Sequence, residues 1–372
     1  MDPRVRRHAE IVVEHSTDIE AGDRVVVTAP PAAEDFAVAV YELLAERGAH
    51  PIMSYNGRFG SPGAERAYLR AVDEDGLDEP DHLTALYEQT DAAIRVRGDE
   101  NVTEMRDVDG ETQAAYQRAY APARSELLST RWCLTQYPTP ANAQLADMST
   151  AAYEDFVWNA VDKDWDAQRE HQQQMVEILD PAEEVRIVSG DETDLTMSVA
   201  GMTTLNDHGE HNLPGGEVFT APVPDSVEGT VRFDLPLYHQ SHEIENASLE
   251  FEDGQVVDYD ADRNADVLGD VLDTDPGARY LGELGIGMNR DIDRFTYNML
   301  FDEKMGDTVH LAVGMAYDEC VPDDREPNES AVHVDMIVDM SEESRIEVDG
   351  EVVQENGTFV FEDGFEASDG SA

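Results

Sequence analysis

Short apolar runs alternate with longer amphipathic segments throughout the first half of the chain. Residues 24–28 (RVVVT) have the length and composition of a buried strand, and residues 33–47 repeat apolar side chains at helical spacing before Gly48. Further strand candidates are residues 51–55, 92–96 and 132–137. Strands that alternate with helices form parallel sheets. This half therefore predicts a Rossmann-like α/β domain.

The loop after the first strand does not fit a dinucleotide site. Residues 29–34 read APPAAE and contain no glycine. A dinucleotide fingerprint needs glycines for its tight turn and for the close approach of the backbone to the pyrophosphate. We therefore expect no nucleotide cofactor in this domain.

The pattern changes in the middle of the chain. Residues 150–179 predict one long helix, or two in succession, and short alternating strands follow. Asp-Gly pairs at 253–254 and 349–350 are typical of hairpin turns. A chain of 372 residues is also longer than one ordinary core. We predict an N-terminal α/β domain (1–182) and a C-terminal α+β domain rich in antiparallel strands (183–372).

The chain is strongly acidic, with 82 Asp and Glu against 25 Lys and Arg and a net charge of −57. The acidic residues are spread along the chain, which is typical of a solvated surface. Such a field repels nucleic acid and anionic membranes, so we expect neither as a partner. At molar salt the Debye length falls to about 3 Å and the self-repulsion is screened. The composition therefore predicts a halophilic protein.

Two further features concern the cellular compartment. Cys133 and Cys320 are the only cysteines, so neither a disulfide framework nor a thiolate zinc site is expected. The N-terminus lacks the apolar region of a signal peptide, and no segment approaches the ~20 apolar residues of a membrane span. We expect a soluble, cytoplasmic protein.

Histidines and carboxylates with apolar neighbours are the candidate metal ligands. His333 and Asp335 alternate with apolar residues, so an ideal strand points both to one face. A metal ion or a mutual hydrogen bond would satisfy them. His310 lies in a similar run, where a histidine is more often a core residue than a ligand. Tyr317, an odd number of residues further on, reaches the same face only if the chain bends near Gly314.

Three glutamates lie in distinctive segments. Glu217 follows a Pro-Gly-Gly turn, Glu283 ends YLGE, and Glu303 lies in LFDEKMGD. Each alone is expected at the surface of so acidic a chain. Together with two histidines and an aspartate, they form the oxygen and imidazole set that binds a pair of divalent cations. Such a pair can activate a water and hold a scissile carbonyl.

The order of these motifs resembles the M29 family of metallo-aminopeptidases, the aminopeptidase T and aminopeptidase S group. The resemblance is weak over most of the chain and good over residues 185–361. It is carried by TDLT (193–196), NLPGGEVFTAP (212–222), LGE (281–283), LFDE (300–303), HLAVG (310–314) with Tyr317, and HVD (333–335). No single segment is specific, but the ordered set is.

The resemblance implies a metal-dependent aminopeptidase with two divalent ions (zinc, cobalt or manganese). The implied ligands are Glu217, Glu283, Glu303, His310, His333 and Asp335. It also implies that Tyr317 stands beside the ions, that the substrates are peptides with a free N-terminus, and that the protein is a homodimer. As catalytic residues we expect Glu283 or Glu303 to move a proton to the leaving amine, and Tyr317 to donate a hydrogen bond to the oxyanion.

Two stretches depart from the family pattern. Residues 304–309 are longer than the usual spacing, which puts Glu303 in question as a ligand, and residues 318–332 are shorter and very acidic. Two other functions are also open. Two histidines and one carboxylate can hold Fe(II) for a ring-cleaving dioxygenase, although such a site does not need the three glutamates. A non-catalytic metal-binding protein would depend on metal only for its stability.

Overall fold

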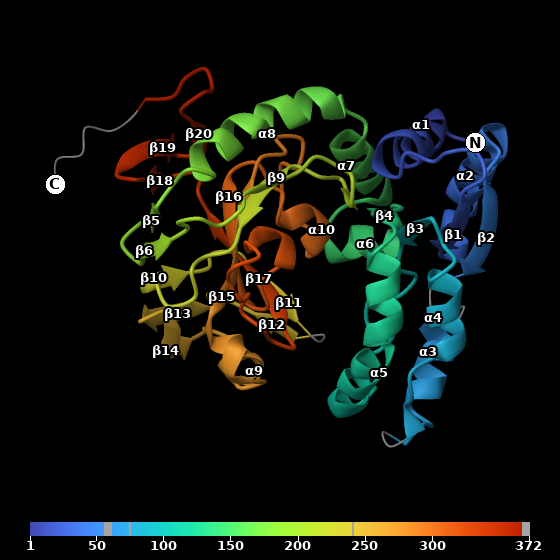
Figure 1. The fold of residues 1–372 in the computed structure, drawn as a ribbon, viewed down its shortest axis with the longest axis horizontal. Coiled ribbons are helices and arrows are strands. Elements are labelled where there is room, and N and C mark those ends of the chain that lie inside the picture. Colours follow the sequence, from blue (N-terminus) through green and yellow to red (C-terminus); the bar gives the residue numbers. More distant parts are fainter. Residues whose placement is uncertain (56–61, 74–75, 240–241, 367–372) are drawn as a thin grey trace. The chain divides into compact units, whose positions relative to one another are not determined.

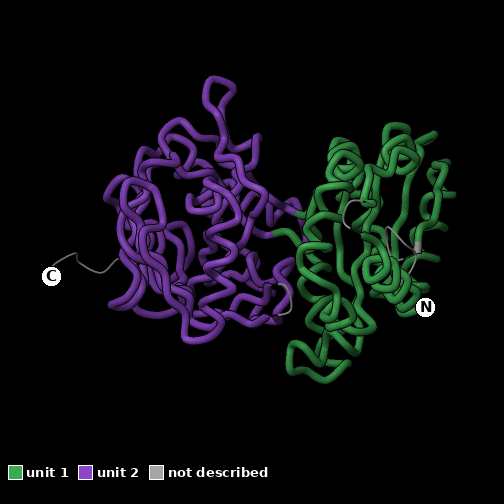
Figure 2. The backbone as a smooth tube through the Cα atoms, turned by 90° about the horizontal axis from the view of Figure 1, so that it is seen from below, with its two compact units in different colours: residues 1–163, 209–215 green, residues 164–208, 216–372 purple. Residues whose placement is uncertain are grey.

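The computed structural model describes residues 1–55, 62–73, 76–239 and 242–366. The chain forms two compact units, shown in green and purple in Figure 2. Unit 1 contains residues 1–163 and 209–215, and unit 2 contains residues 164–208 and 216–372. The chain therefore passes between the units three times. The two functional domains expected on either side of residue 182 stay a prediction.

Unit 1 is built on a parallel sheet with the strand order β2-β1-β3-β4-β8 (Figure 1). Its strands are β1 (Arg24–Ala29), β2 (His50–Tyr55), β3 (Ala92–Arg97), β4 (Arg131–Gln136) and β8 (Asn212–Leu213). Its described α-helices are α1 (Pro3–Ile11), α2 (Glu34–Arg47), α3 (Pro62–Leu69), α4 (Asp81–Tyr87), α5 (Gly110–Leu128), α6 (Pro140–Leu145) and α7 (Thr150–Val161). The predicted parallel α/β architecture is confirmed.

The helix boundaries in this region follow local capping signals. Helix α2 ends at Gly48, whose φ of 78° is left-handed and favours glycine. The segment predicted as one or two helices forms two. Helix α7 begins after Ser149, whose side chain accepts a hydrogen bond from the Ala152 amide. Helix α8 (Trp165–Leu179) begins after Asp164, which caps it in the same way.

Unit 2 contains two large antiparallel sheets. The first has the order β14-β13-β10-β6-β5-β18-β19-β20 and the second β17-β16-β15-β9-β7 (Figure 1). The first contains β5 (Glu184–Ser189), β6 (Thr193–Ser198), β10 (Glu228–Arg232), β13 (Ser248–Glu252), β14 (Gln255–Asp260), β18 (Ser344–Val348), β19 (Glu351–Glu355) and β20 (Thr358–Phe359). The second contains β7 (Leu205–Asp207), β9 (Glu217–Thr220), β15 (Leu281–Gly287), β16 (Thr308–Gly314) and β17 (His333–Asp339). The predicted antiparallel C-terminal half is confirmed.

Smaller elements complete unit 2. They are the hairpin β11 (Leu237–His239) and β12 (His242–Ile244), and the helices α8, α9 (Ala265–Leu272) and α10 (Met299–Asp302). The two predicted Asp-Gly turns connect β13 to β14 and β18 to β19, and both residues of each turn have positive φ. One hydrophobic core takes side chains from both large sheets and from α8 and α9.

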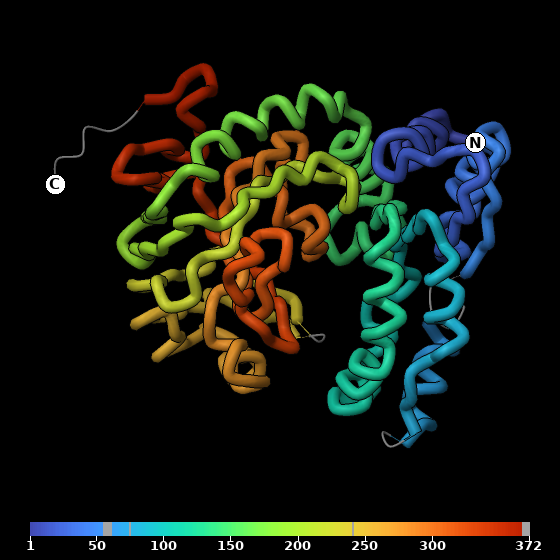
Figure 3. Tube along the Cα trace, in the orientation of Figure 1, coloured from blue at the N-terminus to red at the C-terminus, as the bar shows by residue number. Residues whose placement is uncertain are grey.

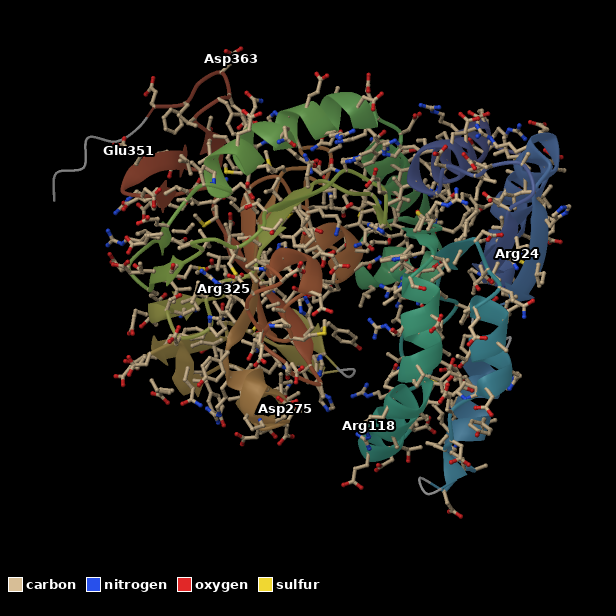
Figure 4. The ribbon with its side chains drawn as sticks, viewed as in Figure 1. Arg24, Arg118, Asp275, Arg325, Glu351 and Asp363 are labelled. Atoms are coloured by element: carbon tan, nitrogen blue, oxygen red, sulfur yellow. The ribbon has the colours of Figure 1, made fainter. Side chains whose placement is uncertain are left out.

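Charge lies mainly on the surface of the described chain. Glu351 and Asp363, both labelled in Figure 4, are exposed. Arg24 is exposed as well and pairs with Asp91 at 2.8 Å. Exposed pairs of this kind contribute little to stability. Buried charged side chains carry a much larger desolvation cost, and those of unit 2 include Glu217, Glu283 and Lys304.

Candidate metal centre

The second sheet of unit 2 has one apolar face and one face that carries the candidate ligands. Leu284, Leu311 and Met336 lie on the first face and join the core. On the opposite face, Gly285 pairs with both His310 and Phe219 in neighbouring strands. The remaining cross-strand pairs on this face are Gly287 with Glu217, Glu283 with Ala312, Ala312 with Asp335, and Gly314 with His333. Figure 3 shows that these strands come from distant parts of the sequence.

A bulge places Glu283 on the ligand face. Leu281 pairs with Val313 and is buried in the core, and regular alternation would point Glu283 the same way. The register shifts between Leu281 and Glu283, so Glu283 turns to the opposite side. Gly282 permits this shift because a Cβ there would lie 2.2 Å from the Met315 carbonyl oxygen.

The candidate ligands fall into two groups that share Glu283. The Oε1 atom of Glu283 lies 3.1 Å from His310 Nε2, and its Oε2 atom lies 3.4 Å from His333 Nε2. Glu217 Oε2 lies 3.3 Å from His310 Nε2, and Asp335 Oδ1 lies 3.5 Å from His333 Nε2. In each group, Glu217–Glu283–His310 and Glu283–His333–Asp335, one donor atom per residue lies within 4.8 Å of the others.

The chemistry of these donors fits divalent cations. Glu217 and Glu283 are each 5% exposed, and the Oε2 atom of each is buried and has no hydrogen-bond partner within the described residues. Buried carboxylate oxygens require compensation. His333 donates its Nδ1 hydrogen to the Met315 carbonyl at 2.8 Å, so Nε2, which faces the carboxylates, is the nitrogen that could bind a metal ion. This is the usual orientation of a histidine that ligates a metal.

The pKa shifts have the same electrostatic origin. Burial alone would lower the pKa of His310, but the hydrogen bond with Glu283 and the charge on Glu217 raise it to about 9. Burial would raise the pKa of Asp335, but His333 lowers it to about 2. The cluster of carboxylates thus stabilises positive charge at both imidazoles. Divalent ions would supply that charge more effectively.

Glu303 and Tyr317 are placed differently from the other predicted residues. Glu303 follows α10 and belongs to neither ligand group; its carboxylate forms an ion pair with Lys304. The chain leaves β16 at Gly314, where φ is 104°. This change of direction brings the Tyr317 ring to 4.9 Å from the His333 ring, so the bend expected from the sequence is present.

Two residues near the donors were missed by sequence reasoning. Lys304 is fully buried, and its Nζ lies 2.9 Å from Glu217 Oε1. The sequence did contain a signal for Lys304. The chain has only two lysines, and this one lies between the LFDE and HLAVG motifs. Gln172 of α8 is also fully buried and donates hydrogen bonds to the backbone carbonyls of Glu217 (2.8 Å) and Asp207 (2.9 Å). No local pattern distinguishes this glutamine.

The sequence matches the family described as "Thermophilic metalloprotease (M29)" over residues 1–365. The chain belongs to the M29 family. It is 30% identical over 397 residues to aminopeptidase T of Thermus aquaticus, and 28% identical over 417 residues to aminopeptidase 2 of Geobacillus stearothermophilus. The first match covers 95% of each chain, and the second covers 96% of this chain and 97% of its relative. The family expected from the motifs is confirmed, and the protein is a metallo-aminopeptidase of the M29 family.

Solved structures agree with this fold. Wild-type AmpT from Thermus thermophilus superposes with a TM-score of 0.83 at 26% identity, covering 96% of this M29 chain and 99% of AmpT. A 2,5-dihydroxypyridine dioxygenase from Pseudomonas putida has a TM-score of 0.62 at 15% identity, covering 98% and 99%. The second similarity concerns the fold alone. No helix within the described ranges combines the length and apolar character needed to cross a membrane.

Proposed function

We propose that this M29 enzyme removes N-terminal residues from peptides by means of two divalent ions that share Glu283. Glu217, Glu283 and His310 would hold one ion, and Glu283, His333 and Asp335 the other. When bound, such a pair polarises the scissile carbonyl and lowers the pKa of a water from 15.7 toward about 7. Zinc, cobalt and manganese all suit these oxygen and imidazole donors.

The remaining side chains support proton transfer and charge stabilisation. Glu303 has a carboxylate outside both ligand groups, so it is available to move a proton from the attacking water to the leaving amine. Tyr317 lies beside His333 and is 39% exposed overall, but partial desolvation beside the carboxylates raises its pKa, so it keeps its proton at neutral pH. Its hydroxyl can therefore donate a hydrogen bond to the developing oxyanion. The acidic surroundings favour a substrate with a free, positively charged α-amine.

Three properties implied by the sequence belong to the same proposal. The enzyme acts as a homodimer in a salt-rich cytoplasm, and molar salt screens the repulsion of its net charge of −57. Neither nucleic acid nor a membrane surface is a partner, because both would face this negative field.

The observation that carries the proposal is the position of Glu283, whose two oxygens face the two histidines separately. The test is release of leucine from leucyl-p-nitroanilide in molar KCl, after removal of metal with EDTA and addition of Zn²⁺, Co²⁺, Mn²⁺ or Fe²⁺. Activity restored by one of the first three ions supports the proposal. Glu283→Gln should abolish it, and a variant with both ions and full activity would refute the assignment of Glu283.

A further inference from the structure

Lys304 is a buried cation within the proposed metal centre. It follows Glu303 directly, and its side chain is 0% exposed, although lysine is seldom fully buried without a charged partner. Its Nζ lies 2.9 Å from Glu217 Oε1 and 3.8 Å from Asp207 Oδ2, and it forms an ion pair with Glu303 Oε1. One ammonium group therefore links Glu217 to Glu303.

The two oxygens of Glu217 have different neighbours. Oε1 contacts the Lys304 ammonium, whereas Oε2 faces His310 Nε2 at 3.3 Å and has no hydrogen-bond partner within the described residues. With Oε1 held by lysine, Oε2 is the oxygen left for a metal ion. Loss of a partner that orients a metal ligand in this way typically costs about 10- to 100-fold in metal affinity or activity.

We propose that Lys304 is a positioning residue, which orients Glu217 toward one metal ion and holds Glu303 outside the metal shell as the proton-transferring carboxylate. The proposal rests on the proposed two-metal function. Charge balance supports the proposal. Two divalent ions and one ammonium group together carry five positive charges, which equal the five negative charges of the nearby carboxylates. These carboxylates are Asp207, Glu217, Glu283, Glu303 and Asp335. Lys304 is also the first residue of the segment 304–309, where the resemblance to the M29 pattern implies a longer spacing than usual.

The first test measures metal binding rather than turnover. Co²⁺ is titrated into metal-free protein against a competing chelator, and its absorption bands report the coordination of the ion. Glu303→Gln should bind two ions with wild-type affinity, whereas Lys304→Met should weaken one of them by about 10- to 100-fold. Lys163→Met, which removes the other lysine, is the matched control and should leave both affinities unchanged.

The second test separates positioning from packing by steady-state kinetics. Glu303→Gln should lower kcat by about 100-fold or more and change KM much less. In the Glu303→Gln background, with enough metal to saturate both sites, the further change Lys304→Met should add no loss in kcat. Under that condition the weaker metal binding is compensated, and the remaining effect of Lys304 acts through the Glu303 carboxylate that is already lost. Circular dichroism and the unfolding temperature establish that each variant is folded. Glu303→Gln retains the lysine, so it tests the role of Glu303 even if Lys304→Met does not fold.

Three results would overturn the inference. Loss of one ion in Glu303→Gln would make Glu303 a metal ligand. Wild-type affinity for both ions in folded Lys304→Met would mean that the ammonium does not orient Glu217. Additive losses of kcat in the double variant at saturating metal would show that Lys304 does not act through Glu303. Failure of the proposed function looks different: the wild-type protein itself would bind no divalent ion or release no amino acid.

Discussion

Substitution of Gly285 by alanine tests how the sheet makes room for the metal centre. Gly285 pairs with His310 across β15 and β16, and the His310 ring, 1% exposed, lies over it. A Cβ at position 285 would lie 2.0 Å from His310 Nε2 and 2.1 Å from Cε1. Comfortable contacts are about 3.5 Å or more. The imidazole must therefore move by about 1.5 Å.

A movement of this size would take His310 away from both carboxylates. Its Nε2 lies 3.1 Å from Glu283 and 3.3 Å from Glu217, so the metal group that contains it is disrupted. A misplacement of about 1 Å at an active site can cost 100-fold in rate. We expect Gly285→Ala to lower kcat/KM at least about 100-fold, equivalent to about 2.7 kcal/mol. Overpacking should also destabilise the fold by about 1–3 kcal/mol.

The assay combines metal content by mass spectrometry, kcat/KM on an aminoacyl p-nitroanilide, and urea unfolding. Gly63→Ala is the control, because a Cβ there meets no atom within 4 Å. Adding His310→Ala to Gly285→Ala should restore stability without activity, since the clash is relieved but a ligand is lost. A Gly285→Ala variant with full metal content and near wild-type kcat/KM would refute the reasoning.

Three further outcomes are expected. Burial lowers the pKa of His8 to about 3, against 6.5 when unfolded, so the unfolded chain takes up the proton first and stability falls as pH decreases from 6.5 toward about 3. Between these pH values, His8 contributes a slope of about 1.4 kcal/mol per pH unit to the free energy of unfolding. Urea unfolding at several pH values should show a smaller slope for His8→Gln than for the wild type. Identical slopes would contradict the assignment. Gln172→Leu should lower the free energy of unfolding by about 1–3 kcal/mol, because the carbonyls of Glu217 and Asp207 lose a buried donor; an unchanged urea midpoint would argue against this support. Finally, the unfolding temperature should rise between 0.1 and 2 M KCl, and calorimetry that shows no rise would count against a halophilic surface.

Local signals in the sequence predicted much of the fold. The apolar runs around β1 and β3 predicted a parallel sheet, and the Asp-Gly pairs predicted two hairpins, because turn geometry depends on adjacent residues. Glu283 was singled out only by its Leu-Gly-Glu motif. Simple alternation from Leu281 would have placed it in the core, and the bulge at Gly282 became visible only with the register of β15 and β16.

The support of the site depends on contacts between distant segments. Gln172 reaches the backbone of Glu217 from a helix 45 residues earlier in the chain. Gly285 matters because His310 lies opposite it in the next strand. Lys304 is adjacent in sequence to Glu303, but its ion pair with Glu217 depends on strand β9. Such pairings are set by tertiary packing, which local sequence patterns do not reveal.

The three passages of the chain between the units limit how this M29 protein can be recombined with another. Strand β8 (Asn212–Leu213) forms the edge of the unit 1 sheet, and Glu217 starts a strand of unit 2 only four residues later. A chimera joined once, after residue 163, would give the recipient sheet a foreign edge strand along with the catalytic half. Exchange of unit 2 alone needs two additional breakpoints, around residues 209–215. The two halves of this enzyme are therefore interlaced rather than modular.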